Sequence, residues 1–173
     1  MLTPLILFAL PQLSQPSPHI YISQAHPVAE ASVLTPNYTH AQLRSILNGL
    51  DFSSPPEDEA SFPLTQYDGA MIDWVTIDAV KAFQTYFQLE VDGIAGSQTK
   101  AMAAKAMRIL QADLNLVMKL NPPLSADQPF FDLRTIEAVR TFQRSYGLSP
   151  ANGVANLPTR LKLRQMAQSP TLP

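Results

Sequence analysis

The chain has no cysteine among its 173 residues. Disulfides, thiolate metal sites and cysteine nucleophiles are therefore excluded, and any small domain must be stabilised by packing alone. Glycine occurs only six times, and the sequence contains no Gly-rich loop that would hold a phosphate. A chain of this length with 46% hydrophobic residues can form one ordinary domain or two small ones.

Positive charge is scarce in the first part of the chain, where the first basic residue is Arg44. The formal net charge of -2 conceals a split between two segments. Residues 39–104 carry 3 basic and 9 acidic side chains, a net charge of 3 - 9 = -6, whereas residues 105–167 carry 9 basic and 4 acidic ones, a net charge of 9 - 4 = +5. The total predicts no strong attraction to nucleic acid or to an anionic membrane.

The apolar run near the start of the chain is short. LTPLILFAL, at residues 2–10, cannot span a bilayer, so no stable membrane insertion is expected. Small residues at Ala25 and Ala31 offer cleavage sites after this run, which favours a secretory signal peptide. No basic residue precedes the run, and a frayed N-terminus or a misassigned start is the alternative. Residues 1–38 are interpreted as a signal peptide or disordered leader, and residues 168–173 as a disordered tail.

A helical hydrophobic pattern begins at residue 39. Residues 39–52 place apolar side chains on one face of a helix, with Thr39 as its N-cap. The next segment, residues 53–66, contains three prolines and three adjacent acids and is expected to be a solvated loop.

One stretch of the sequence occurs twice. TIDAVKAFQTYFQL, from residue 76, returns 59 positions later as TIEAVRTFQRSYGL, and seven of the fourteen pairs are identical. Both copies predict a helix capped by an aspartate three residues upstream, Asp73 or Asp132. Each helix has one apolar stripe, formed by Ile77, Val80, Phe83 and Phe87 in the first copy and by Ile136, Val139, Phe142 and Tyr146 in the second. The chain is therefore expected to contain two tandem units, residues 39–104 and 105–167.

No glycine or proline interrupts residues 97–121. This predicts a nearly continuous helix of about 22 residues, capped by Gly96 or Ser97, that serves both units and is roughly 33 Å long. A helix of this kind would couple the units rigidly, whereas a break near Ala104 would let them swing. Each unit is expected to bury an apolar core of its own.

The repeated pattern resembles the peptidoglycan-binding domain family, which consists of small three-helix modules attached to many bacterial wall hydrolases. The resemblance covers about residues 39–167 and implies an all-α fold of two tandem three-helix bundles. The matching residues are Thr76, Ala79, Val80, Phe83, Gln84, Leu89, Asp92, Gly93 and Thr99 in the first unit, and Thr135, Ala138, Val139, Phe142, Gln143, Leu148, Gly153 and Thr159 in the second.

The departures from the family pattern fall on loops. The second unit has Pro129-Phe130 where the first keeps Asp68-Gly69, and Asn152 stands where the family usually has aspartate. The resemblance implies peptidoglycan as the ligand and a wall hydrolase as a candidate partner. Recognition of a polar polymer needs aromatic surface beside fixed hydrogen-bonding groups. The candidate ligand-binding residues are Tyr67, Asp68, Trp74, Asp92, Phe130, Arg144 and Asn152.

Several of these residues have structural alternatives. Trp74, the only tryptophan, is expected either to pack partly against the helix stripe or to stack on ligand. Asp68 and Asp92 are more often turn formers than ligands. Gln84 and Gln143 are expected to hydrogen-bond a loop backbone.

Catalysis is not expected. His40 is the only histidine outside the leader, so a zinc peptidase or a serine–histidine hydrolase lacks its parts. The glutamates of the two units are expected on solvated surfaces rather than in a deep cleft with a raised pKa: Glu57, Glu59, Glu90 and Glu137. Neither a cofactor nor a metal site is predicted.

Two other binding functions remain open. Basic residues such as Arg140, Arg144, Arg160, Lys162 and Arg164 would allow a helix-turn-helix DNA reader, although a solvated basic face is the simpler interpretation. The opposite charges of the units would also suit a protein-interaction scaffold that has lost the wall ligand. The sequence favours an exported, non-catalytic wall-binding protein of the bacterial periplasm or cell envelope.

Overall fold

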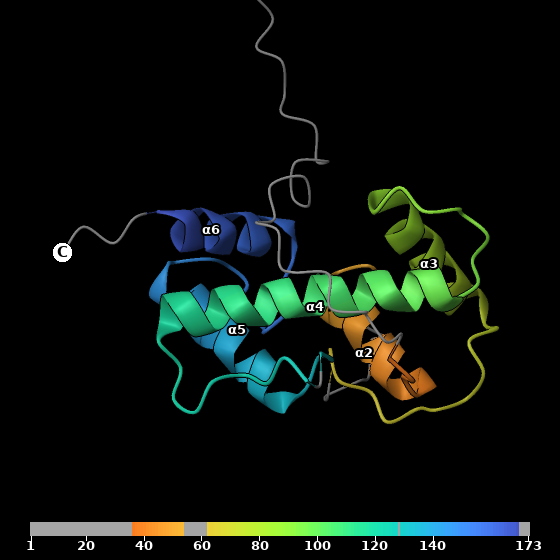
Figure 1. Cartoon of the computed structure of the whole chain (residues 1–173), viewed down its shortest axis with the longest axis horizontal. Coiled ribbons are helices and arrows are strands. Elements are labelled where there is room, and N and C mark those ends of the chain that lie inside the picture. Colours follow the sequence, from red (N-terminus) through yellow and green to blue (C-terminus); the bar gives the residue numbers. More distant parts are fainter. Residues whose placement is uncertain (1–35, 54–61, 128, 170–173) are drawn as a thin grey trace, which may run out of the picture.

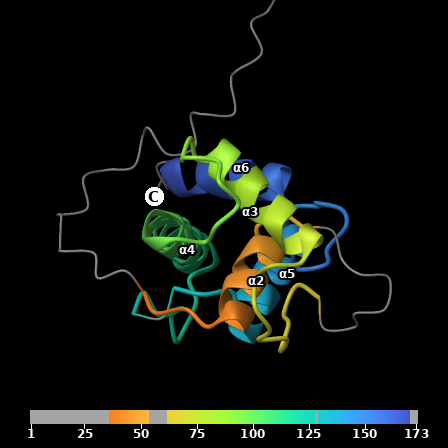
Figure 2. The same ribbon diagram turned by 90° about the vertical axis from the view of Figure 1, so that its right-hand side faces the viewer.

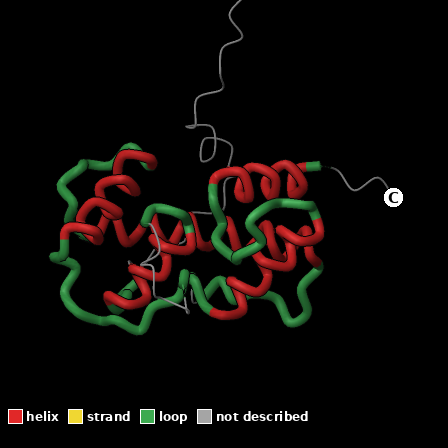
Figure 3. The backbone as a smooth tube through the Cα atoms, turned by 180° about the vertical axis from the view of Figure 1, so that it is seen from behind, coloured by secondary structure: helices red, strands yellow, loops and turns green. Residues whose placement is uncertain are grey.

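The computed structural model describes residues 36–53, 62–127 and 129–169. Within these residues the chain forms α-helices and no strand (Figure 3). The predictions for residues 1–35, for loop residues 54–61 and for residues 170–173 lie outside the described part. The helices are α2 (His40–Gly49), α3 (Trp74–Tyr86), α4 (Ser97–Met118), α5 (Leu133–Ser145) and α6 (Leu157–Gln168) (Figure 1).

Helix α4 is the axis of the molecule. It runs without interruption for 22 residues, which confirms the predicted continuous helix. Gly96 is its N-cap, and Lys119 ends it in a left-handed conformation with φ 51°. Helices α2 and α3 lie at its N-terminal end and α5 and α6 at its C-terminal end, as Figure 1 shows from the side and Figure 2 nearly along the helix axis.

The duplication is visible in the helix caps and in one repeated hydrogen-bond network. The carboxylates of Asp73 and Asp132 accept from the third residue of α3 and α5, as predicted. Gln84 and Gln143 each donate to a loop carbonyl and to a threonine hydroxyl, and each accepts the N–H of a turn glycine. Both glutamines are therefore structural, which confirms the prediction made for them.

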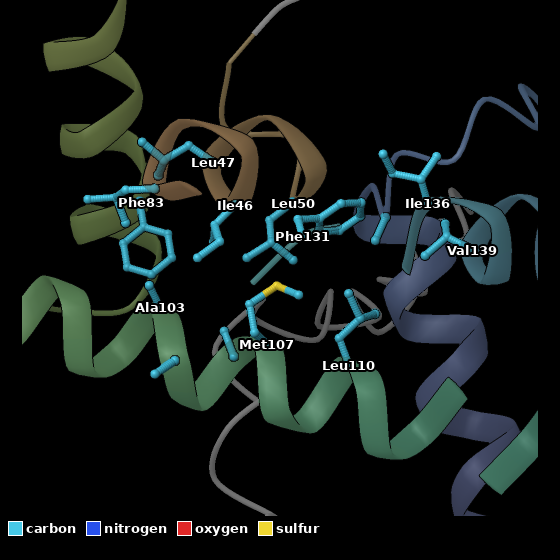
Figure 4. Packing of buried hydrophobic residues seen from close by; sticks show 14 of the residues in the cluster. Ile46, Leu47, Leu50, Phe83, Ala103, Met107, Leu110, Phe131, Ile136 and Val139 are labelled. Carbon is cyan, nitrogen blue, oxygen red and sulfur yellow. The ribbon is translucent and has the colours of Figure 1, made fainter. Parts of the chain in front are cut away.

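The two units share one core. Phe83 and Phe142 are fully buried, as the repeat predicts, but the buried side chains of both units form a single continuous cluster. Figure 4 shows Leu50, the C-cap of α2, beside Phe131 of the second unit, with Met107 of α4 nearby. The expectation that each unit buries a separate core is wrong, because the C-terminal end of α2 packs onto the second unit.

A glycine makes this close contact possible. A Cβ atom on Gly49 would lie 2.3 Å from the ring of Phe131, so only glycine admits the ring there. The carbonyl of Gly49 also accepts the N–H of Ala155 at 2.7 Å, and the guanidinium of Arg160 donates to the carbonyl of Leu50. The second unit thus satisfies the carbonyls of Gly49 and Leu50 at the C-terminal end of α2, where intrahelical partners are lacking.

The core begins before α2. Tyr38 is 7% exposed and donates its hydroxyl to the carbonyl of Pro129 at 2.6 Å. Residue 38, assigned to the leader on sequence alone, is thus fixed against a loop of the second unit. Among the described residues, no helix is both long and apolar enough to cross a membrane.

Candidate ligand-binding site

One face of α2 holds the loop that precedes α3. Ala41, Arg44, Ser45 and Asn48 occupy the one-face spacing of a helix, and each hydrogen-bonds the segment 63–73. The N–H of Ala41 donates to the Asp68 carboxylate, and the Ser45 hydroxyl accepts from the N–H of Thr65. The loop is therefore fixed along the whole length of α2.

Arg44 is the centre of this arrangement. Its side chain is 9% exposed, and a guanidinium has five N–H groups to satisfy. All its nitrogens donate to the first unit: to the carbonyls of Tyr67 (3.3 Å), Gly69 (2.6 Å) and Ala70 (2.9 Å), the carboxylate of Asp73 (3.2 Å) and the hydroxyl of Thr76 (3.4 Å). The guanidinium also lies 4.7 Å from the ring centre of Tyr67. Arg44 therefore positions the loop and leaves little hydrogen-bonding capacity for a ligand.

A shallow groove of about 320 Å³ opens between α2, the loop and the start of α3. Its walls combine aliphatic and aromatic carbon with a few polar groups, the usual composition of a ligand site. The lining residues are Arg44, Leu47, Asn48, Ser53, Thr65, Tyr67, Asp73, Val75, Thr76 and Ala79.

Large apolar side chains are exposed around this groove. Tyr67 is 64% exposed and lines it, while Trp74 is 76% exposed and lies between two lining residues, Asp73 and Val75. The expectation that Trp74 packs against the helix stripe is therefore wrong. Ile72, two residues before Trp74, is also exposed, at 79%. Sequence reasoning missed Ile72 and Arg44, although a single arginine on the apolar face of the first helix was an available signal.

Two carboxylates at this site remain ionised at neutral pH. The hydrogen bond from the N–H of Ala41 is the largest effect on Asp68 and lowers its pKa. For Asp73 the largest single effect is desolvation, which raises the pKa, but hydrogen bonds from Thr76 and Arg44 outweigh it, and the pKa lies below the ordinary value. The Asp68 carboxylate therefore presents negative charge next to Tyr67, whereas the charge of Asp73 is paired with Arg44.

Asp92 lies at the opposite end of α3 and does not line the groove. Its carboxylate accepts from the N–H of Ile94 at 2.8 Å and from the Gln84 amide at 2.7 Å. In the second unit the side chain of Asn152 accepts from the N–H of Val154 in the same way. Both residues form turns, and the structure does not bring Asp92 together with Tyr67 or Trp74.

The Asp92 turn leads to a pH prediction. The hydrogen bond from Ile94, and then that from Gln84, lower the pKa of Asp92 in the folded chain. A lowered pKa stabilises the fold above the unfolded pKa, and the stabilisation is lost as the pH falls through the folded pKa. We expect Asp92→Asn to reduce the free energy of unfolding at pH 7, with the gap to wild type shrinking towards pH 2. Urea unfolding at several pH values measures this gap, with Asp78→Asn as the exposed control on α3. A gap that does not change with pH would contradict the prediction.

The second-unit candidates are scattered. Phe130 is half-buried and packs against the core, whereas Arg144 is exposed in the last turn of α5. The interpretation of Arg160 and Arg164 as a solvated basic face is wrong. Arg160 is 5% exposed and reaches the end of α2, and Arg164 pairs at 3.1 Å with Asp113 on α4.

Across the described ranges, no three histidine, cysteine, aspartate or glutamate side chains gather in a way that could hold a metal ion.

Comparison with known proteins identifies the modules. The model of the peptidoglycan binding domain family matches residues 41–102 and again residues 104–163. The chain belongs to this family. Searches among curated proteins and solved structures find no match.

Proposed function

We propose that this chain is a non-catalytic protein that binds peptidoglycan and anchors itself, or a partner hydrolase, to the bacterial wall. The observation that carries the proposal is the groove of the first unit, which lies in a peptidoglycan-binding domain and has exposed aromatic rings beside it. A flat aromatic surface suits the apolar face of a sugar ring, and fixed polar groups beside it orient a polar polymer.

The groove chemistry supports binding rather than turnover. The carboxylates near the exposed rings, Asp68 and Asp73, both have lowered pKa values, so neither is held protonated as a general acid at neutral pH. Asp68 accepts from the N–H of Ala41 at the start of α2, and Asp73 accepts from the N–H of Thr76 in the first turn of α3, which are structural roles. The proposed location is the periplasm or cell envelope, where this ligand lies, and the mass of the mature N-terminus tests export.

Sedimentation with purified, insoluble peptidoglycan tests the proposal. Wild type is expected in the pellet, and Trp74→Ala and Tyr67→Ala are each expected to weaken binding by about tenfold, because truncation of an aromatic anchor commonly costs 1–2 kcal/mol or more. Leu161→Ala is the matched control, since Leu161 is 52% exposed on α6. Wild type that remains in the supernatant would contradict wall binding and favour the protein-interaction scaffold.

A further inference from the structure

The two units differ at the place where the first unit has its groove. Ile72, two residues before α3, is 79% exposed, whereas Phe131, two residues before α5, is fully buried against the first unit. Val75 lines the groove in the second position of α3. Its counterpart in α5 is Arg134, which donates to the carbonyl of Pro122 at 2.6 Å. The residues at the start of α5 are thus engaged in contacts within the protein.

The side chain that supports the loop before the second helix also differs between the two units. Arg44 lies four residues before Asn48, and Gln111 lies four residues before Asn115. Arg44 holds three loop carbonyls and the Asp73 carboxylate. Gln111 donates only to the carbonyl of Phe130 at 3.3 Å and to a threonine hydroxyl, and its own carbonyl oxygen has no partner among the described residues. The second loop therefore lacks the buried cation that fixes the first.

The second unit also contacts the C-terminal end of α2. Phe131 packs on Gly49, the N–H of Ala155 donates to the carbonyl of Gly49, and Arg160 donates to the carbonyl of Leu50. These contacts fix the C-terminal turn of the helix that carries Arg44 on its other half.

We propose that the first unit alone carries the wall-binding site, with Arg44 as its positioning residue, and that the second unit serves as a structural support for α2. This inference rests on the proposed function and assigns it to one copy. The first unit then binds the ligand and the second unit stabilises the first, so the two copies of the domain are not equivalent binding modules.

Arg44→Gln tests the positioning role, because it places in the first unit the residue found at the matching position of the second. We expect the variant to keep its helical circular dichroism and to lose about tenfold in peptidoglycan affinity at a temperature where it is folded. Arg44→Lys keeps the charge without the planar fork and is expected to restore binding only in part. A folded Arg44→Gln variant with wild-type affinity would overturn the positioning role.

Moving the tryptophan tests the assignment to one unit. Trp74 is the first residue of α3 and the only tryptophan, and Leu133 is the first residue of α5 and 66% exposed. Both side chains are exposed, so their exchange is not expected to disturb folding. We expect Trp74→Leu combined with Leu133→Trp to bind peptidoglycan about tenfold more weakly than wild type, as weakly as Trp74→Leu alone. Soluble wall fragments are expected to change the fluorescence of wild type but not that of the double variant.

The outcomes separate the two proposals. If wild type pellets and the double variant binds equally well, or if Leu133→Ala weakens binding as much as Trp74→Ala, the assignment to the first unit is overturned while wall binding stands. If wild type does not pellet with peptidoglycan, the proposed function fails and this inference fails with it.

Discussion

Phe131→Ala is expected to destabilise the whole protein by about 3–5 kcal/mol, the usual cost of removing a buried phenylalanine. The ring is fully buried and lies against Gly49, so its loss leaves a cavity between the two units. Glycine offers no side chain that can move in to fill this space. Because the cavity is shared, we expect the helices of both units to lose protection together, and not those of the second unit alone.

Urea unfolding and amide hydrogen exchange measure this effect. Exchange in α3 reports on the first unit and exchange in α5 on the second. For the most protected amides of both helices, the free energy of opening is expected to fall by similar amounts. Leu133→Ala is the control, because this nearby side chain is 66% exposed and its truncation is expected to change stability by about 0.5 kcal/mol or less. A Phe131→Ala variant that weakens α5 and leaves α3 unchanged would contradict the shared core.

The second large effect is expected for Gln143→Leu. Gln143 is fully buried and forms three hydrogen bonds: it donates to the carbonyl of Val154 at 2.8 Å and to the hydroxyl of Thr159 at 3.1 Å, and it accepts the N–H of Gly153 at 2.9 Å. Leucine has a similar volume but makes none of these hydrogen bonds. The Val154 carbonyl and the Thr159 hydroxyl keep their bonds to Asn156, whereas the N–H of Gly153 loses its partner. An unpaired buried N–H costs about 1–3 kcal/mol and each of the two other lost hydrogen bonds about 0.5–1.5 kcal/mol, so the variant is expected to lose about 3 kcal/mol.

Thermal and urea unfolding of this variant give the loss directly. Gln84→Leu, at the matching position of the first unit, is expected to show a loss of similar size, because Gln84 makes the same three contacts. Gln165→Leu is the control on the exposed side of α6. Where folded, Gln143→Leu is expected to keep wild-type affinity for peptidoglycan. A loss below about 1 kcal/mol for both buried glutamines would contradict the role assigned to the network.

Local sequence patterns predicted much of this fold. The repeat, the aspartate caps and the stripes on α3 and α5 follow from spacing and side-chain chemistry within short segments. The 22-residue helix follows from the absence of glycine and proline after Ser97. These features depend on neighbours along the chain, and hydrophobic periodicity reports on such neighbours well.

The shared core could not be predicted in this way. The sequence around Gly49 predicts only the end of a helix, and the sequence around Phe131 predicts only an apolar residue before a cap. Neither segment indicates that these two residues are in contact. The same applies to Ile72 and Phe131, which occupy equivalent places in the two copies and have opposite exposure. The candidate site was predicted in part: Tyr67 and Trp74 are exposed at one surface, but Asp92 lies elsewhere, and the role of Arg44 depends on loop carbonyls that periodicity does not reveal.

The shared core is the feature on which the support of α2 by the second unit depends, and differential scanning calorimetry of the wild type tests it most directly. If the two units share one core, they should unfold together in a single transition whose calorimetric and van't Hoff enthalpies agree. Two resolved transitions, or a calorimetric enthalpy about twice the van't Hoff value, would mean that the units unfold independently and would contradict the shared core.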